Sequence, residues 1–285
     1  AANLLSEKKL YKIINFSLNR TAKSSSDAII DAQFIGNEKD KLDMVIVCAG
    51  GDPFLFNNIK VFDWLRKKSR EGVTLVGVSG GPVILVKAGL MDGKRMTLHW
   101  EHADTFREIW PNILLEKSLF VIDRKRITCA GGIAPLDLMF TLISNHHGES
   151  FARKVSDWFM HTEVRPSEGP QRSGIVERYN VNNSKIVSAI EIMENNLSNT
   201  LSLKEISEIV DISPRQLNRL FKKNLNKTTM DVYRKLRLEL AQKLLKQSQF
   251  SITEIAFSCG FSSSSQFSQS FKEKFGVMPS QYKNL

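Results

Sequence analysis

Hydrophobic residues in the first half of the chain form short continuous runs that alternate with helical spacings. Met44–Gly51 and Val73–Val78 are apolar runs typical of buried parallel strands. Asn57–Arg70 has apolar residues at helical spacing, and Gly80–Ala88 predicts a second helix that stops at Gly89. This alternation predicts a layered α/β fold with a mostly parallel sheet.

The same alternation continues to about residue 160. We expect shorter strands at Tyr11–Phe16, Arg95–Leu98, Phe120–Ile122 and Ile127–Cys129, and helices at about Pro135–Asn145 and Glu149–Phe159. These elements complete a first domain over residues 1–161. Residues 162–182 are rich in proline and glycine, which predicts a linker.

From residue 183 onward only helical spacing remains, and one pattern occurs twice, about 50 residues apart. Each copy predicts two short helices. The expected apolar face of the first helix is Leu203, Ile206, Ile209 and Val210 in one copy and Ile252, Ile255, Ala256 and Cys259 in the other. In the second helices, Leu217, Leu220 and Phe221 match Phe267, Ser270 and Phe271.

The ends of these helices are marked by capping residues. Four Ser-x-x-Glu or Ser-x-x-Gln sequences predict capping boxes, which begin at Ser202, Ser213, Ser251 and Ser263. Asp211 and Gly260 occupy the same turn position, where a left-handed backbone is expected. A capped helix pair with a tight turn, present twice, predicts two helix-turn-helix units and therefore DNA binding by residues 183–285.

The polar face of each second helix carries side chains of the kinds that hold phosphates or read base edges. The candidate DNA-binding residues are Arg215, Gln216, Asn218, Arg219, Ser264, Ser265, Ser268 and Gln269. A solvated face on an ordinary helical bundle is the alternative for any single helix. Two capped copies with matching apolar faces favour DNA.

This part of the chain resembles the AraC/XylS transcription regulators. The resemblance rests on Ile192–Leu197, Ser213–Leu217, Cys259–Ser262 and Phe271–Tyr282. It implies seven helices, with a long one near Met230–Gln247 that joins the two units. It also implies that both second helices enter successive major grooves of double-stranded DNA and that RNA polymerase is a partner. Many members have Arg where this chain has Gln269.

Composition agrees with these assignments. The chain has 40 Lys+Arg and 30 Asp+Glu, and residues 183–285 contain 15 basic and 9 acidic residues, so positive charge is denser there. The three cysteines and five histidines show no metal-ligand spacing, so no metal or cofactor is expected. No apolar run reaches 18 residues, which argues against a membrane span, and the few scattered cysteines indicate a reducing, cytoplasmic protein.

A second motif lies in the first domain. Gly77-Val78-Ser79-Gly80-Gly81 falls between a predicted strand and a predicted helix, the setting of a nucleophile elbow. Val73–Trp100 and Cys129–Gly132, followed by Asp137, resemble class I glutamine-amidotransferase-like domains of the PfpI type, which have a flavodoxin-like layered fold. In catalytic relatives the elbow residue is Cys and a His stands opposite. His99 matches that His, but Ser79 replaces the Cys.

Three interpretations of Ser79 and His99 stay open. They satisfy each other or the backbone, they bind a small effector in a vestigial active site, or Ser79 is a nucleophile. Since a serine needs a strong base and an oriented triad, we expect no catalytic residue and no enzyme activity. The favoured candidate effector pocket contains Gly50, Gly51, Ser79, Gly80, His99 and Gly131. The alternative is a serine amidase or esterase that uses Ser79 and has a DNA-binding tail.

Together, the two parts resemble the amidotransferase-like branch of the AraC family. That branch implies an effector-responsive regulator, here expected to be an activator that responds to an amino acid or a quaternary amine. It also implies a homodimer formed by the first domain. An architectural DNA-binding protein with an inert first domain is a further alternative. Because the chain opens at Ala1 without Met, we expect that roughly two dozen residues, the first strand and helix of the fold, precede it in the intact domain.

Overall fold

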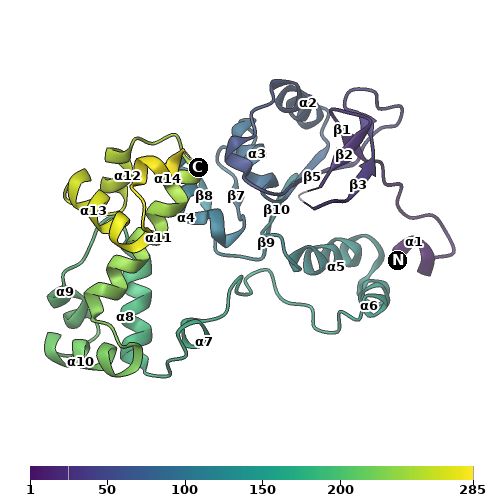
Figure 1. Ribbon diagram of the computed structural model, residues 1–285. Helices are drawn as coiled ribbons and strands as arrows, with labels where there is room; N and C mark the ends of the chain where they lie inside the picture. Colours follow the sequence, from purple (N-terminus) through teal and green to yellow (C-terminus); the bar gives the residue numbers. More distant parts are fainter. Residues whose placement is uncertain (25, 285) are drawn as a thin grey trace. The chain divides into compact units, whose positions relative to one another are not determined.

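The structure is a computed structural model that describes residues 1–24 and 26–284. The chain divides into two compact units (Figure 1). Unit 1 comprises Ala1–Ala103 and Trp110–Gln171, and unit 2 comprises Asp104–Ile109 and Arg172–Leu285. None of the described helices is long and apolar enough to cross a membrane.

Unit 1 is built on a four-stranded sheet. Its order is β5 (Met44–Ala49), β6 (Thr74–Ser79), β10 (Arg126–Cys129) and β9 (Phe120–Asp123). The first three strands are parallel, with Cys48 opposite Val78 and Val78 opposite Cys129, and β9 is antiparallel to β10. This confirms the predicted α/β fold with a mostly parallel sheet. The connections between neighbouring parallel strands contain helices, as this topology requires.

Helices pack on the sheet much as the apolar spacing predicts. They are α2 (Ile59–Arg70), α3 (Gly81–Lys87) and α5 (Ala134–His147), and α6 (Glu149–Trp158) packs against α5. In Figure 1, α2 and α3 lie on one side of the sheet and α5 on the other. The core under α5 brings Leu138 and Leu142 against Phe120 and Ile127. A short 3-10 helix, η1 (Pro53–Leu55), follows β5.

Two strand predictions need correction. β5 lies at the edge of the sheet, and Ile46 and Cys48 on one of its faces are exposed, so this run is not wholly buried. The expected strand at Tyr11–Phe16 is wrong over most of its length, since only Phe16 belongs to a strand. That strand, β1 (Phe16–Ser17), pairs with β4 (Gln33–Phe34) instead of joining the main sheet.

Short elements complete unit 1. They are α1 (Ala2–Leu5), the antiparallel pair β2 (Thr21–Lys23) and β3 (Ile29–Asp31), and the parallel pair β7 (Arg95–Met96) and β8 (Leu114–Leu115). The apolar pattern did not predict α4 (Trp100–Ile109), whose last six residues belong to unit 2.

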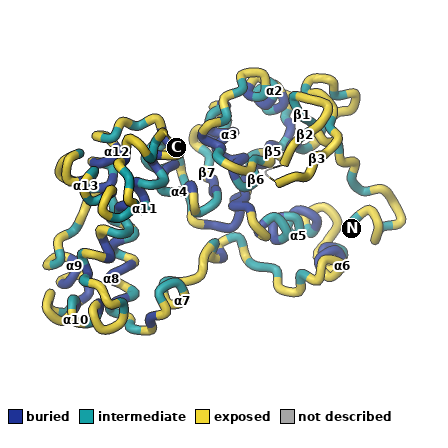
Figure 2. The backbone as a smooth tube through the Cα atoms, viewed as in Figure 1, coloured by how far each residue is buried: buried dark blue, intermediate teal, exposed yellow. Residues whose placement is uncertain are grey.

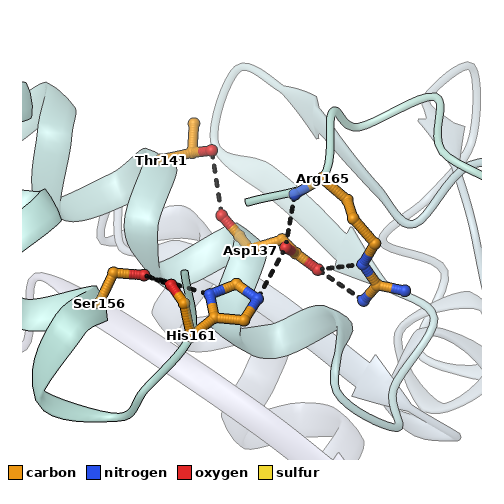
Figure 3. A network of polar contacts seen from close by, with 5 residues as sticks. All are labelled: Asp137, Thr141, Ser156, His161 and Arg165. Carbon is orange, nitrogen blue, oxygen red and sulfur yellow. Dashed lines mark hydrogen bonds and ion pairs between the residues drawn. The ribbon is translucent and has the colours of Figure 1, made fainter. Parts of the chain in front are cut away.

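The end of unit 1 is fastened by a buried carboxylate (Figure 3). Asp137 on α5 is fully buried and accepts hydrogen bonds from the backbone N–H and the guanidinium of Arg165, the shortest at 2.6 Å. His161 Nε2 lies 3.3 Å from the same carboxylate, and the His161 backbone carbonyl accepts from Ser156 Oγ. Downstream, Gln171 donates to the carbonyl of Ser118 at 2.6 Å. Residues 161–171 are therefore bonded to unit 1.

Unit 2 is helical. Beyond the α4 segment, its helices are α7 (Ile175–Tyr179), α8 (Ser184–Asn195), α9 (Leu203–Ile209), α10 (Pro214–Leu225), α11 (Thr229–Gln247), α12 (Ile252–Ser258), α13 (Ser264–Phe275) and α14 (Pro279–Lys283). The seven helices from α8 onward match the number that the AraC resemblance implies. The joining helix α11 spans almost the predicted residues.

Two hydrophobic cores lie along α11. The first gathers around Leu217, Phe221 and Tyr233, and the second around Phe267 and Phe271. Figure 2 shows buried residues along α8 and α11. The expected apolar faces are confirmed except at Ile209, which is 58% exposed because it is the last residue of a two-turn helix whose buried side is already formed by Ile206 and Val210.

Candidate nucleic-acid interface and effector pocket

Local capping fixes the ends of the four helices that form the two helix-turn-helix units. Ser202 with Glu205, Ser213 with Gln216, and Ser251 with Glu254 form complete capping boxes. Each box satisfies two backbone N–H groups at a helix start. At the fourth site Ser263 Oγ accepts from Gln266 N, but the Gln266 side chain accepts from Ser262 Oγ instead of returning to the cap. That predicted box is therefore only half formed.

Both turns have the expected left-handed residue, Asp211 with φ 54° and Gly260 with φ 71°. The second turn also needs a glycine for space. A Cβ on Gly260 would lie 2.3 Å from Thr200 Cγ2 and 2.9 Å from the Leu197 carbonyl oxygen. The loop before α9 thus packs directly against the turn of the second unit.

The second helix of the first unit, α10, presents its predicted polar face to solvent. Arg215, Gln216 and Arg219 are exposed. Asn218 is half-buried, and its Oδ1 accepts a 3.0 Å hydrogen bond from Thr229 N, so it also supports the start of α11. Lys222 and Lys223 follow in the last turn of α10, so its outward surface is strongly basic.

The matching helix of the second unit, α13, is less charged. Ser265 and Gln269 are exposed, whereas Ser264 and Ser268 are half-buried. Gln269 lines a polar hollow of about 370 Å³ together with Arg234 and Arg237 of α11. The two units therefore share one frame but present different surfaces. Charge on the second unit comes mainly from α11 and from Lys272 and Lys274 at the end of α13.

Arg237 is a structural residue that the sequence pattern did not reveal. Its Nε donates to the Cys259 carbonyl and its Nη2 to the Gly260 carbonyl, both at 2.7 Å. The guanidinium lies 4.2 Å from the centre of the Phe261 ring. Burial lowers the pKa of Arg237, but these carbonyls and the ring suit a cation. Arg237 therefore ties the long helix to the second turn.

In unit 1 the elbow has the expected geometry. Ser79 ends β6 with φ 59°, a left-handed conformation that costs a non-glycine residue roughly 1–2 kcal/mol. Gly131 faces it closely, since a Cβ on Gly131 would lie 2.8 Å from Ser79 Cβ. Gly80 N donates to the Ala49 carbonyl at 3.1 Å, which brings the end of β5, just before Gly50, to the elbow. The structure thus gathers Gly50, Gly80 and Gly131 around Ser79.

His99 lies directly before α4 in an aromatic neighbourhood. Its ring centre is 5.3 Å from that of Trp100 and 6.1 Å from that of His102. His102 in turn packs edge-on against Phe54, which stacks with Trp110 at 6.1 Å. Aromatic faces of this kind attract organic cations.

Glu101, two residues after His99, is not placed to orient the imidazole as a triad carboxylate would. The Glu101 carboxylate lies 3.9 Å from His99 Nδ1, too far for a hydrogen bond, and Nδ1 is instead 3.3 Å from the Glu101 backbone N–H. Cys129, the nearest thiol in sequence to Gly131, is buried, and burial raises its pKa to about 11, so it is a poor nucleophile. Within residues 1–24 and 26–284, no group of three or more His, Cys, Asp or Glu could hold a metal ion.

Known proteins share both parts of this arrangement. The helix-turn-helix domain family matches residues 206–284, and the DJ-1/PfpI family matches residues 11–145. The HTH-type transcriptional regulator GlxA of Rhizobium meliloti (strain 1021) is 38% identical over 281 residues, which cover 98% of this chain and 87% of that protein. The HTH-type transcriptional regulator CdhR of Pseudomonas aeruginosa is 42% identical over 241 residues, 85% of this chain and 72% of that protein.

A solved AraC-type transcriptional regulator from Chromobacterium violaceum is 38% identical over 35% of this chain and 89% of that chain, with a TM-score of 0.34. Two helix-turn-helix units combined with a DJ-1/PfpI domain define a DNA-binding transcription regulator. The chain belongs to the AraC family, in the branch whose members carry a DJ-1/PfpI domain.

Proposed function

We propose that this regulator controls transcription in response to a small polar metabolite bound at the elbow of unit 1. The observation that carries the proposal is the elbow itself, where Ser79 keeps a left-handed backbone against Gly131 although the catalytic Cys of relatives is absent. Strained backbone residues cluster at active sites and ligand-binding sites. Hydrogen bonding to an effector is the role that Ser79 can fill without an activated thiolate.

The proposed effector is an amino acid or a quaternary amine. Its polar end would meet Ser79 and the backbone of Gly50, Gly51, Gly80 and Gly131. His99 would close the site, and the nearby aromatic rings would favour a ligand with positive charge. The resemblance to the amidotransferase-like branch supports this ligand class.

On DNA, we propose that α10 and α13 enter successive major grooves. The exposed Arg215, Gln216 and Arg219 would contact the first groove, with Asn218 beside them. The second groove would meet the candidate residues of α13, which are Ser264, Ser265, Ser268 and Gln269. Because cationic side chains are fewer on α13, the first unit should supply more of the phosphate affinity.

The remaining parts of the proposal follow from the family resemblance. The protein acts in the cytoplasm as a homodimer formed through unit 1, and it activates transcription by recruiting RNA polymerase. It has no enzymatic activity. An effector shifts this system only by its different affinity for the two arrangements of the dimer.

A thermal-shift screen of the protein against amino acids, betaines and guanidino compounds tests the sensor proposal. A ligand should raise the unfolding temperature of the wild type by mass action, and Ser79→Phe, which fills the elbow, should abolish the shift. A hit that stabilises Ser79→Phe equally would place the ligand elsewhere. No hit, with normal DNA binding, would argue for an inert first domain.

A serine amidase or esterase is the second candidate, favoured by the left-handed Ser79 at the elbow. It predicts turnover of amide or ester substrates that Ser79→Ala abolishes. Absence of turnover in the wild type, measured on p-nitrophenyl acetate and on amide substrates, would reject it.

A further inference from the structure

The second half of helix α4 is part of the DNA-binding unit. Trp100–Ala103 belong to unit 1, whereas Asp104–Ile109 of the same helix belong to unit 2. Thr105 and Phe106 are fully buried. Because successive turns of a helix are joined by backbone hydrogen bonds, a shift of the first turn is passed to the second.

Three polar contacts within unit 2 hold this segment. The Asp104 carboxylate lies 3.5 Å from Lys243 Nζ on α11. One turn further along α11, Gln247 Oε1 accepts a 3.1 Å hydrogen bond from Thr105 Oγ1. The Glu108 carboxylate accepts a 3.0 Å hydrogen bond from Ser198 Oγ, in the loop before α9. An acidic helical surface therefore meets a basic and polar one.

The contact with α11 faces away from the reading helix of the second unit. Lys243 follows Arg234 by nine residues, and at 3.6 residues per turn this places the two on opposite sides of α11, about 180° apart. Arg234 shares the polar hollow with Gln269 of α13. Since α4 contacts the opposite side, its contacts are compatible with α13 in a DNA groove.

The loop contact reaches the second turn. Ser198, which donates to Glu108, has its carbonyl oxygen 3.0 Å from the position of a Cβ on Gly260. Burial, and then the charge of Glu108, raise the pKa of Cys259, the residue before Gly260. The segment Asp104–Ile109 therefore rests on both elements that position the second unit, the end of α11 and the loop against its turn.

We propose that Asp104–Ile109 couples the candidate effector pocket to the second helix-turn-helix unit. The helix starts directly after His99, whose carbonyl accepts a 2.9 Å hydrogen bond from His102 N, so the first turn of α4 follows the position of His99. Occupancy of the pocket biases the position of α4 and, through Lys243, Gln247 and Ser198, the setting of the second unit. The sensing half of this inference rests on the proposed function.

Linkage makes the coupling testable without an identified effector. If α4 influences DNA binding, DNA binding must influence α4 by the same free energy. The experiment measures amide hydrogen exchange in the full-length protein, free and bound to a duplex enriched from random sequence by the protein itself. Peptides covering residues 104–109 should exchange about fivefold slower or more on DNA, the lower end of typical coupling energies.

Reversing the charges of Asp104 and Lys243 tests whether the coupling passes through their ion pair. Asp104→Lys and Lys243→Asp should each remove the DNA-dependent slowing in residues 104–109 while leaving the slowing in α10 and α13. The double variant Asp104→Lys with Lys243→Asp should restore the slowing in residues 104–109, because the ion pair is rebuilt with opposite polarity. Lys204→Asp, on the exposed surface of α9, makes the same change of net charge as Lys243→Asp but away from α4, and it should behave as wild type in this segment. Thr105→Val with Gln247→Leu provides a neutral test of the neighbouring contact if a charge variant fails to fold.

Unchanged exchange in residues 104–109 on DNA, or slowing that persists in both single charge variants, would overturn the inference. Its failure is distinguishable from failure of the sensor proposal. A thermal-shift screen without hits rejects effector binding, whereas the exchange experiment involves DNA alone. Positive exchange data without an effector would leave α4 coupled to the second unit and responsive to some other event in unit 1.

Discussion

Alanine at Gly260 should destabilise the second helix-turn-helix unit more than alanine at any open left-handed glycine. The new Cβ would lie 2.3 Å from Thr200 Cγ2 and 2.9–3.0 Å from two backbone carbonyl oxygens, where the chain has little room to move. The left-handed backbone costs an alanine roughly 1–2 kcal/mol, and overpacking adds about 1–3 kcal/mol. We expect a loss of about 2–5 kcal/mol.

Gly276 provides the matched control. It ends α13 with φ 80° and has nothing within 4 Å of the Cβ position, so Gly276→Ala carries the backbone strain alone, about 1–2 kcal/mol. Native-state hydrogen exchange of the α13 core amides in full-length protein reports both losses, at about tenfold per 1.4 kcal/mol. Thr200→Ala should rescue part of the Gly260→Ala loss. Equal losses at Gly260 and Gly276 would refute the packing of the turn against the loop before α9.

Other expected outcomes follow from single contacts. Arg219→Ala should weaken binding to the selected duplex by about 1–3 kcal/mol in titrations, and an equal loss on random DNA would show a phosphate contact instead of base reading. Arg237→Met removes the donor to two turn carbonyls and should lower the stability of the second turn, measured by amide hydrogen exchange, by about 1–3 kcal/mol. An unchanged exchange rate there would refute the role of Arg237. Asp137→Asn weakens the hydrogen bonds between Asp137 and the Arg165 guanidinium and should speed proteolysis within residues 161–171. Unchanged cleavage would show that Asp137 does not bind this segment to unit 1. Burial raises the pKa of Cys129 to about 11, so its thiol should resist iodoacetamide below about pH 9 and react only as the pH approaches this pKa. Rapid labelling at neutral pH would contradict the burial of Cys129.

The features that could be predicted from the sequence are those that depend on neighbouring residues. Three of the four capping boxes formed as expected, because the serine and its partner lie within one turn of each other. The same locality explains the left-handed turn residues Asp211 and Gly260. The parallel strands followed from continuous apolar runs, which need no knowledge of their partners.

Features set by distant neighbours could not be predicted in this way. Helix α4 buries the polar residues His102 and Thr105, so apolar residues alone do not mark its buried face. Arg237 is one basic residue among several on α11, and only the folded turn shows which carbonyls it serves. Ile209 has helical spacing but stays exposed, since a short helix buries fewer positions than its period suggests.

The two readings of unit 1 differ in what they ask of Ser79. As a nucleophile it needs an oriented base, whereas as a ligand-binding residue it needs only a fixed hydroxyl above the helix that follows. The left-handed backbone and the contact with Gly131 supply the second requirement. The Glu101 carboxylate, 3.9 Å from His99 Nδ1, is too distant to orient that ring by a hydrogen bond.

Methylation interference on a duplex selected by the full-length protein shows whether both helix-turn-helix units bind DNA in successive major grooves, as proposed above. Binding by both units predicts two clusters of interfering guanines on one face, centred about one helical turn, roughly 10 base pairs, apart. Arg219→Ala should weaken one cluster and Gln269→Ala the other. A single cluster, affected by Arg219→Ala alone, would contradict the claim and leave the second unit without a role in reading DNA.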